Sequence, residues 1–144
     1  MGEGPALAPL LREAERRGVE PRVCWSGAVD PAALPAHVGA CDGALIPAIN
    51  DYASPLKLFD SLGAGVVTLA PDQPNLRENI VDGETGLLFR AGDVDDLART
   101  LGAVVRDREA SRRIGVAGRR ALLERDWTWS GNADRVLEVY ESLR

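Results

Sequence analysis

The stretch "SPLKLFDSLGAGVVTLA", residues 54–70, decides the fold because it joins a helix directly to a buried strand. Its leucines and phenylalanine have helical spacing, which predicts a helix over residues 55–64 with Ser54 as N-cap and the following proline at N1. The run "VVTLA", residues 66–70, is typical of a strand buried on both faces. One residue stands out: Lys57 lies in the first helical turn, where the dipole makes a lysine mildly unfavourable.

The rest of the chain alternates in the same way, and this alternation predicts the fold class. Short apolar runs predict strands at residues 22–26 ("RVCWS"), 43–47 ("GALIP"), 66–70 and 87–89 ("LLF"). Helical spacing predicts helices at residues 6–17, 31–40 (with Asp30 as N-cap), 55–64, 94–106, 109–124 and 130–143, and a short helix capped by Asn75. Because such alternation forms a parallel sheet between helices, we expect an α/β fold, a Rossmann-like parallel sheet with helices on both faces.

Composition and charge argue against several functions. The chain has 144 residues, 45% of them hydrophobic, which suits a single domain over residues 1–144. Its net charge of −5 argues against nucleic acid as a partner. No run approaches the roughly 18 apolar residues of a membrane span, and the start lacks a signal peptide, so we expect a cytoplasmic protein.

Cysteine and histidine usage gives no sign of a metal site. Cys24 and Cys41 form no C-x-x-C pair, and we expect both to be buried thiols of a reducing compartment. His37 is the single histidine, too few nitrogen and sulfur ligands for zinc, and we expect it to be exposed on a helix. We therefore expect no metal and no cofactor.

The helix at residues 55–64 has the features of an anion site. It follows the strand at residues 43–47, and parallel sheets bind ligands outside the carboxyl ends of their strands. The amides of Leu56 and Lys57 are left free by helix geometry, so a bound phosphate would make the position of the lysine favourable. Asp60 could accept hydrogen bonds from sugar hydroxyls. Lys57 and Asp60 could equally be a plain i,i+3 surface pair.

The central segment and its flanking regions resemble a known protein family. The segment "SPLKLFDSLGAGVVTLAPDQPNLRENIVDGETGLLF", residues 54–89, resembles the donor-binding half of retaining glycosyltransferases of the GT-B fold, family GT4. Upstream, "GEGP" (2–5) and "VCWSGAV" (23–29) resemble the "G-x-GP" and "V-x-F-x-G-x-V" segments of the family. Downstream, "WTWSGNADRVLEVYESL" (127–143) resembles its closing helix. The resemblance covers essentially the whole chain in order.

The resemblance implies a nucleotide-sugar site. The family acid that binds the ribose hydroxyls matches Asp60, and the helix start that cradles the diphosphate matches Ser54, Leu56 and Lys57. The turn against the nucleobase matches Gly27 and Val29, and a nearby loop matches Gly2 and Gly4. The family usually has glutamate at the place of Asp60, and Tyr52 stands where many members have an acid that contacts the donor sugar. The catalytic residues stay unknown.

The resemblance also implies that segments of the family domain are missing from this chain. The acceptor domain, the first strand and helix of the donor domain and most of its second strand have no counterpart. With the strand order 3-2-1-4-5-6, the strand at residues 22–26 would lie two strand widths from that at residues 43–47. We expect that a partner or swapped chain completes the sheet, or that the two strands pair directly.

Two functions follow as expectations. The first is the donor-binding part of an enzyme that transfers a sugar from a nucleoside-diphosphate sugar to an acceptor. The second is a non-catalytic nucleotide-binding or interaction module that retains the fold. We do not expect this chain alone to catalyse transfer, because transfer needs a positioned acceptor. The base, the sugar and the acceptor are not specified by the sequence.

Overall fold

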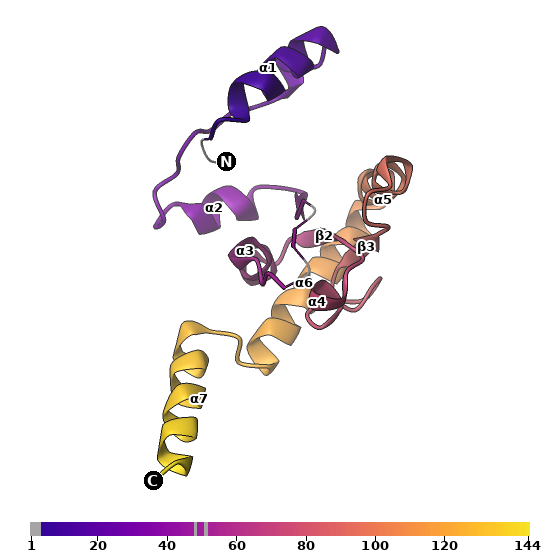
Figure 1. Ribbon diagram of the computed structural model, residues 1–144. Helices are drawn as coiled ribbons and strands as arrows, with labels where there is room; N and C mark the ends of the chain where they lie inside the picture. The colour runs from indigo at the N-terminus through magenta and orange to yellow at the C-terminus, as the bar shows by residue number, and fades with distance from the viewer. Residues whose placement is uncertain (1–3, 48, 51) are drawn as a thin grey trace. The chain divides into compact units, whose positions relative to one another are not determined.

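The computed structural model describes residues 4–47, 49–50 and 52–144 (Figure 1). The chain divides into two compact units, Met1–Leu34 and Pro35–Arg144.

The first unit is built around one amphipathic helix. Helix α1 (Leu7–Arg16) confirms the helix predicted over residues 6–17, and Gly18 follows its C-cap in the left-handed conformation (φ +67°). Glu13 on this helix accepts hydrogen bonds from the guanidinium groups of Arg16 and Arg17. These bonds lower the pKa of the Glu13 carboxyl to about 2.

The strand predicted over residues 22–26 is wrong. Arg22 ends a 3₁₀ turn, η1 (Glu20–Arg22), and residues 23–26 belong to no hydrogen-bonded strand of the described chain. Val23 has extended dihedral angles (φ −107°, ψ 119°), so its local conformation suits a strand. A strand also needs a neighbour for its backbone groups, and the three-stranded sheet of the described residues does not include this segment.

Helix α2 (Leu34–Gly39) begins later than predicted. Asp30 starts a turn before it: its Oδ1 accepts a hydrogen bond from the N–H of Ala32 (2.8 Å), and its carbonyl accepts from Ala33 and Leu34. The side chain of Asp30 thus fixes the turn at residues 30–33 and the helix follows it.

The second unit contains a parallel sheet. Its strands are β1 (Gly43–Leu45), β2 (Val67–Pro71) and β3 (Leu87–Phe89), in the order β1-β2-β3 and all parallel. Every residue of the central strand β2 is buried. This burial confirms the expectation drawn from its uninterrupted apolar run.

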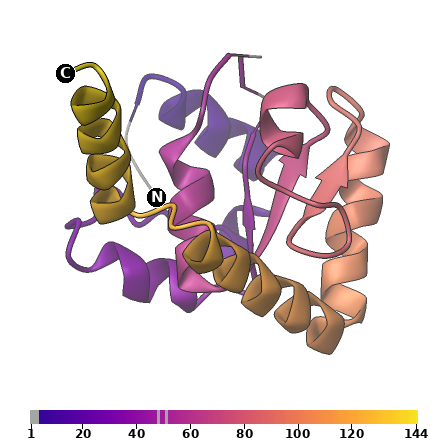
Figure 2. The same cartoon turned by 90° about the horizontal axis from the view of Figure 1, so that it is seen from below.

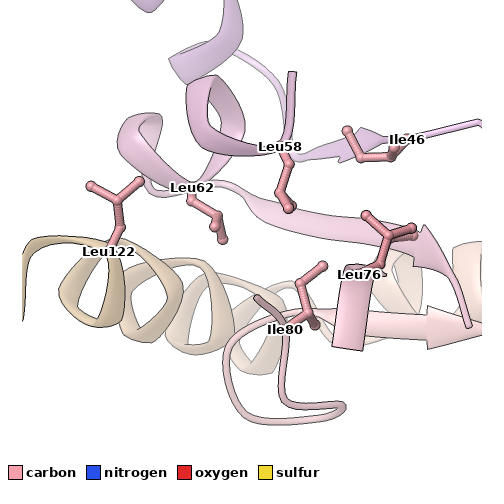
Figure 3. Close-up of a cluster of buried hydrophobic side chains, with 7 residues drawn as sticks. Ile46, Leu58, Leu62, Leu76, Ile80 and Leu122 are labelled. Atoms are coloured by element: carbon pink, nitrogen blue, oxygen red, sulfur yellow. The ribbon is translucent and has the colours of Figure 1, made fainter. Parts of the chain in front are cut away.

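Helices cover both faces of this sheet, as predicted. On one face, α3 (Leu56–Ala64) and α4 (Pro74–Arg77) contribute to a core cluster that includes Ile46, Leu58, Leu62, Ala70, Leu76, Ile80 and Leu122 (Figure 3). On the other face, Val67, Leu69 and Phe89 pack with Val104 of α5 (Val94–Arg106). Since neighbouring strand residues point to opposite faces, one short strand serves both clusters.

Helix α6 (Arg108–Glu124) passes close to the amino ends of the strands, with α3 and α5 on either side (Figure 2). Two of its glycines allow this approach. A Cβ on Gly115 would lie 2.4 Å from the carbonyl oxygen of Gly65, and one on Gly118 would lie 2.5 Å from that of Thr85. Any side chain at either position would collide with backbone.

The helices of the carboxyl-terminal third match their predicted bounds to within a residue. Helix α7 (Trp129–Ser142) ends the chain's helical part. Asp93, Asp107 and Thr128 cap α5, α6 and α7, each accepting a hydrogen bond from the backbone N–H three residues on. Among the described residues, no helix has both the length and the apolar character needed to cross a membrane.

Candidate functional site

The candidate site is the first turn of α3. This helix begins at Leu56, and its N-cap is Pro55, whose ψ of 122° is extended, so the prediction of Ser54 as N-cap is wrong by one residue. The N–H of Leu58 is the first with an intrahelical partner, the carbonyl of Pro55 (2.9 Å). The amides of Leu56 and Lys57 precede it and point out of the helix start. The positive end of the α3 dipole lies here.

The loop that leads into α3 is tied to the turn that follows β2. The N–H of Ile46 bonds to the carbonyl of Leu69 (2.8 Å), which keeps the start of the loop on the sheet. The Gln73 amide donates to the carbonyl of Ile49 (3.0 Å), and the Asn75 amide donates to that of Ala53 (2.6 Å). These bonds connect the two strand ends that form this edge of the sheet.

Asn75 was predicted to cap α4, and this is wrong. The N-cap of α4 is Gln73, with a proline at N1, and Asn75 lies within the helix. Its side chain is available to hold the loop because the proline already fixes the helix start. The sequence signal for this tether is the polar run "PDQPN" directly after a buried strand, where side chains reach the same edge of the sheet.

Helix α3 is anchored to β2 by two buried hydroxyl groups. The Thr68 hydroxyl donates to Ser61 Oγ (3.0 Å), and Ser61 Oγ in turn lies 2.9 Å from the carbonyl oxygens of Lys57 and Leu58. Both residues are buried. The first turn of the helix is thereby held at a fixed position against the central strand.

Lys57 and Asp60 lie exposed on this turn. Within the described part of the chain neither takes part in an ion pair, so the plain i,i+3 surface pair is not found. Lys57 is also the only lysine among the 17 lysine and arginine residues of the sequence, which sets this position apart from the other basic residues. Free amides, an ammonium group and a carboxylate thus share one open turn.

The structure brings four of the predicted site residues together, namely Ser54, Leu56, Lys57 and Asp60. The others belong to the first unit. Gly27 has a positive φ of 63°, which suits a tight turn, and Val29 is half-buried. The carbonyl of Gly4 accepts a hydrogen bond from the N–H of Leu7, and Gly2 lies outside the described residues.

The two cysteines differ from expectation, because both are exposed free thiols. Cys24 lies in the unpaired segment 23–26, and Cys41 lies in the bend after α2, with its Sγ 3.4 Å from the carbonyl of His37. His37 is exposed on α2, as predicted. Over residues 4–47, 49–50 and 52–144, no three His, Cys, Asp or Glu side chains gather closely enough to hold a metal ion.

Comparison with known proteins finds a matching family and relatives named as mannosyltransferases. The family described as "Glycosyl transferases group 1" matches residues 1–121. A GDP-mannose-dependent alpha-(1-6)-phosphatidylinositol monomannoside mannosyltransferase of Mycolicibacterium smegmatis is 27% identical over the whole chain and 39% of its own length. A phosphatidyl-myo-inositol mannosyltransferase of Mycobacterium leprae is 31% identical over 88% of the chain and 33% of its own length. The chain therefore spans between a third and two fifths of these relatives.

Solved structures share the fold. The HepE protein of Anabaena, crystallised with UDP, superposes with a TM-score of 0.84 at 19% identity, over 94% of this chain and 36% of its own. A sucrose-phosphate synthase from Thermosynechococcus elongatus superposes with a TM-score of 0.87 at 20% identity, over 99% of this chain and 37% of its own. At such identities the likeness shows a GT-B-type fold. The family match over most of the chain shows more: this chain belongs to the group 1 glycosyltransferases.

Proposed function

We propose that this chain is the donor-binding part of a GT4-type retaining glycosyltransferase, which transfers a sugar from a nucleoside-diphosphate sugar to an acceptor. The observation that carries the proposal is the open first turn of α3. It combines free amides, Lys57 and Asp60 at the carboxyl end of β1, where α/β sheets bind ligands. Relatives named as GDP-mannose-dependent and a neighbour crystallised with UDP support a nucleotide-sugar ligand.

The diphosphate would lie at the start of α3. Its oxygens would accept hydrogen bonds from the amides of Leu56 and Lys57, and the Lys57 ammonium would offset its charge. When the bond between the anomeric carbon and the β-phosphate oxygen breaks, negative charge grows on the leaving diphosphate. A helix start already fixed by the Ser61–Thr68 anchor stabilises that charge without reorganising.

The nucleoside would be held by Asp60 and by the first unit. The two carboxylate oxygens of Asp60 would accept hydrogen bonds from the ribose hydroxyls. Gly27 and Val29 would lie against the base, with Gly2 and Gly4 nearby. We propose that the donor is bound without a metal or another cofactor, because the helix start and Lys57 supply the positive charge. The exposed free thiols suit the reducing cytoplasm proposed as its location.

The proposed transfer also needs a site that binds the acceptor, and we assign no such site to this chain. The chain spans only 33–39% of the relatives reported above, so we assign the chemistry to a longer enzyme and no catalytic residue to this chain. The same fact favours the second candidate, a non-catalytic nucleotide-binding module that retains the fold. The two candidates share the donor site and differ in turnover.

Isothermal titration calorimetry of the chain with UDP, GDP and ADP, and with the nucleotide sugar of each, tests the proposed donor site. We expect one base to bind, and Asp60→Ala to weaken that binding about 10- to 100-fold, because it removes a charge-assisted hydrogen-bond acceptor. The matched control is Asp134→Ala, which removes another exposed carboxylate, on α7, and should leave binding as in the parent chain. Equal loss in both variants, or no binding by a folded sample, would contradict the proposal.

A further inference from the structure

A hollow lies at the edge of the sheet opposite the start of α3, at the amino ends of β1 and β2. It has a volume of about 580 Å³. Its walls come from the segment joining α3 to β2 (residues 64–67), from Cys41 and Asp42 before β1, and from one side of α6. All of these belong to the second unit. We call this hollow the amino-edge pocket.

Four of the five arginines of α6 divide into two sets. Arg113 pairs with Glu109 (3.0 Å) and Arg120 pairs with Glu124 (2.6 Å), each one helical turn away. Arg112 and Arg119 instead line the amino-edge pocket, and among the described residues no carboxylate pairs with either. The chain carries 22 aspartates and glutamates, so two unpaired guanidinium groups at one pocket are not explained by a shortage of acids.

The two unpaired arginines can serve one ligand. Residues seven apart on a helix lie about 10 Å apart along the axis and on nearly the same side. The stem of Arg119 packs over Gly65: its Cδ would be 3.6 Å from a Cβ at that glycine. A third arginine of the lining, Arg108, pairs with Asp42 across the pocket. Three arginines against one aspartate leave the lining positively charged.

We propose that the amino-edge pocket binds a small phosphorylated molecule at Arg112 and Arg119. Guanidinium groups match phosphate oxygens with paired hydrogen bonds, and the charge of about −1.5 to −2 on a phosphate offsets two of them better than a single carboxylate does. The volume lies within the range of small-molecule sites. The amides and lysine of the α3 start are at the other edge of the sheet, so this site is separate from the proposed donor site and does not depend on it.

Cys41 lines the pocket and provides a reporter of occupancy. In a Cys24→Ser background it is the only thiol, and its alkylation by neutral iodoacetamide can be timed with and without inorganic pyrophosphate at matched ionic strength. At about ten times the dissociation constant, alkylation should slow roughly tenfold, because only the unoccupied pocket reacts. Lys57→Ala should leave this protection intact, which separates it from binding at the donor site.

Paired arginine variants decide the proposal. Arg112→Gln with Arg119→Gln should abolish protection by pyrophosphate. Arg113→Gln with Arg120→Gln removes the same charge from the same helix and should keep it. Asp42→Asn, which frees Arg108, should tighten binding about two- to fivefold. Absence of protection in the parent chain, or equal loss in both double variants, would overturn the proposal.

Discussion

At its amino end α3 is open to solvent, whereas at its carboxyl end it is enclosed by α6. Leu56 in the first turn has 63% of its surface exposed, and Lys57 and Asp60 are exposed beside it. At the other end Leu62 is buried, Gly65 closes the helix with a φ of 72°, and the backbone of α6 approaches so closely that Gly115 has no room for a side chain.

This difference separates stability from ligand binding within one helix. Where α6 crosses the carboxyl end of α3 and the start of β2, close backbone packing tolerates little change. The start of α3, at the carboxyl edge, keeps its first amides, Lys57 and Asp60 free of protein partners, and a ligand can then use these groups. Substitutions at the α6 glycines should therefore change the free energy of unfolding, whereas substitutions at the start of α3 should change ligand binding.

The largest effect on the free energy of unfolding is expected where α6 packs at the amino edge. Gly115→Ala would place a methyl group 2.4 Å from the carbonyl oxygen of Gly65 and 2.7 Å from the amide nitrogen of Val67. Helix α6 must then move away from β2, and we expect a loss of about 3 kcal/mol or more in the free energy of unfolding. Urea unfolding monitored by circular dichroism measures it.

Gly63→Ala is the matched control, because a Cβ at Gly63 meets nothing within 4 Å and the residue lies inside α3. It should be neutral or stabilise the protein by up to about 1 kcal/mol, since alanine favours helix more than glycine does. If both variants lose the same stability, close packing is not what holds this edge.

A smaller effect on stability is expected at the carboxyl edge, where a buried carboxylate is held by hydrogen bonds. Asp96 is buried on α5, and its carboxylate accepts hydrogen bonds from the N–H of Arg90 (2.7 Å) and the guanidinium of Arg99 (2.6 Å). These bonds lower the pKa of Asp96 below its usual 3.8. The stabilisation is therefore complete above the unfolded-state pKa and is lost as pH falls through the folded-state pKa.

Thermal unfolding measured between about pH 5 and pH 2 tests whether stability falls as the pH is lowered. Asp96→Asn should flatten the fall in melting temperature on the acid side, because the amide has no proton to take up. Asp95→Asn, one residue away on the exposed side of α5, should keep the parent profile. Identical profiles for all three proteins would show that Asp96 does not couple folding to pH.

Local signals explain which elements could be predicted from the sequence. Helices α5, α6 and α7 match to within a residue because capping side chains and apolar spacing are both local. The strand at residues 22–26 was wrong because a strand also depends on a neighbour that the segment itself does not encode. The start of α3 shifted by one residue because the ψ angle of Pro55 is not restricted as its φ is.

The candidate site was predictable in part for the same reason. The conflict between Lys57 and the helix dipole is visible within one turn, and it indicates the candidate site. The hydrogen bonds from Gln73 and Asn75 join residues that are 24 and 22 positions apart in the sequence. They form only because the strand order brings the two loops together. The amino-edge pocket could not be predicted from the sequence of α6 alone, because residues 41–42 and 64–67 lie beside Arg112 and Arg119 only in the fold.

The most direct test of the central claim uses the single lysine. Reductive methylation with ¹³C-formaldehyde labels two amines, Lys57 and the amino terminus, and their NMR signals can be followed while UDP, GDP or ADP is added. We predict that one nucleotide shifts the Lys57 signal in a saturable way, because its diphosphate lies at the start of α3. If a folded sample binds a nucleotide while the Lys57 signal does not move, the donor site is not at this helix.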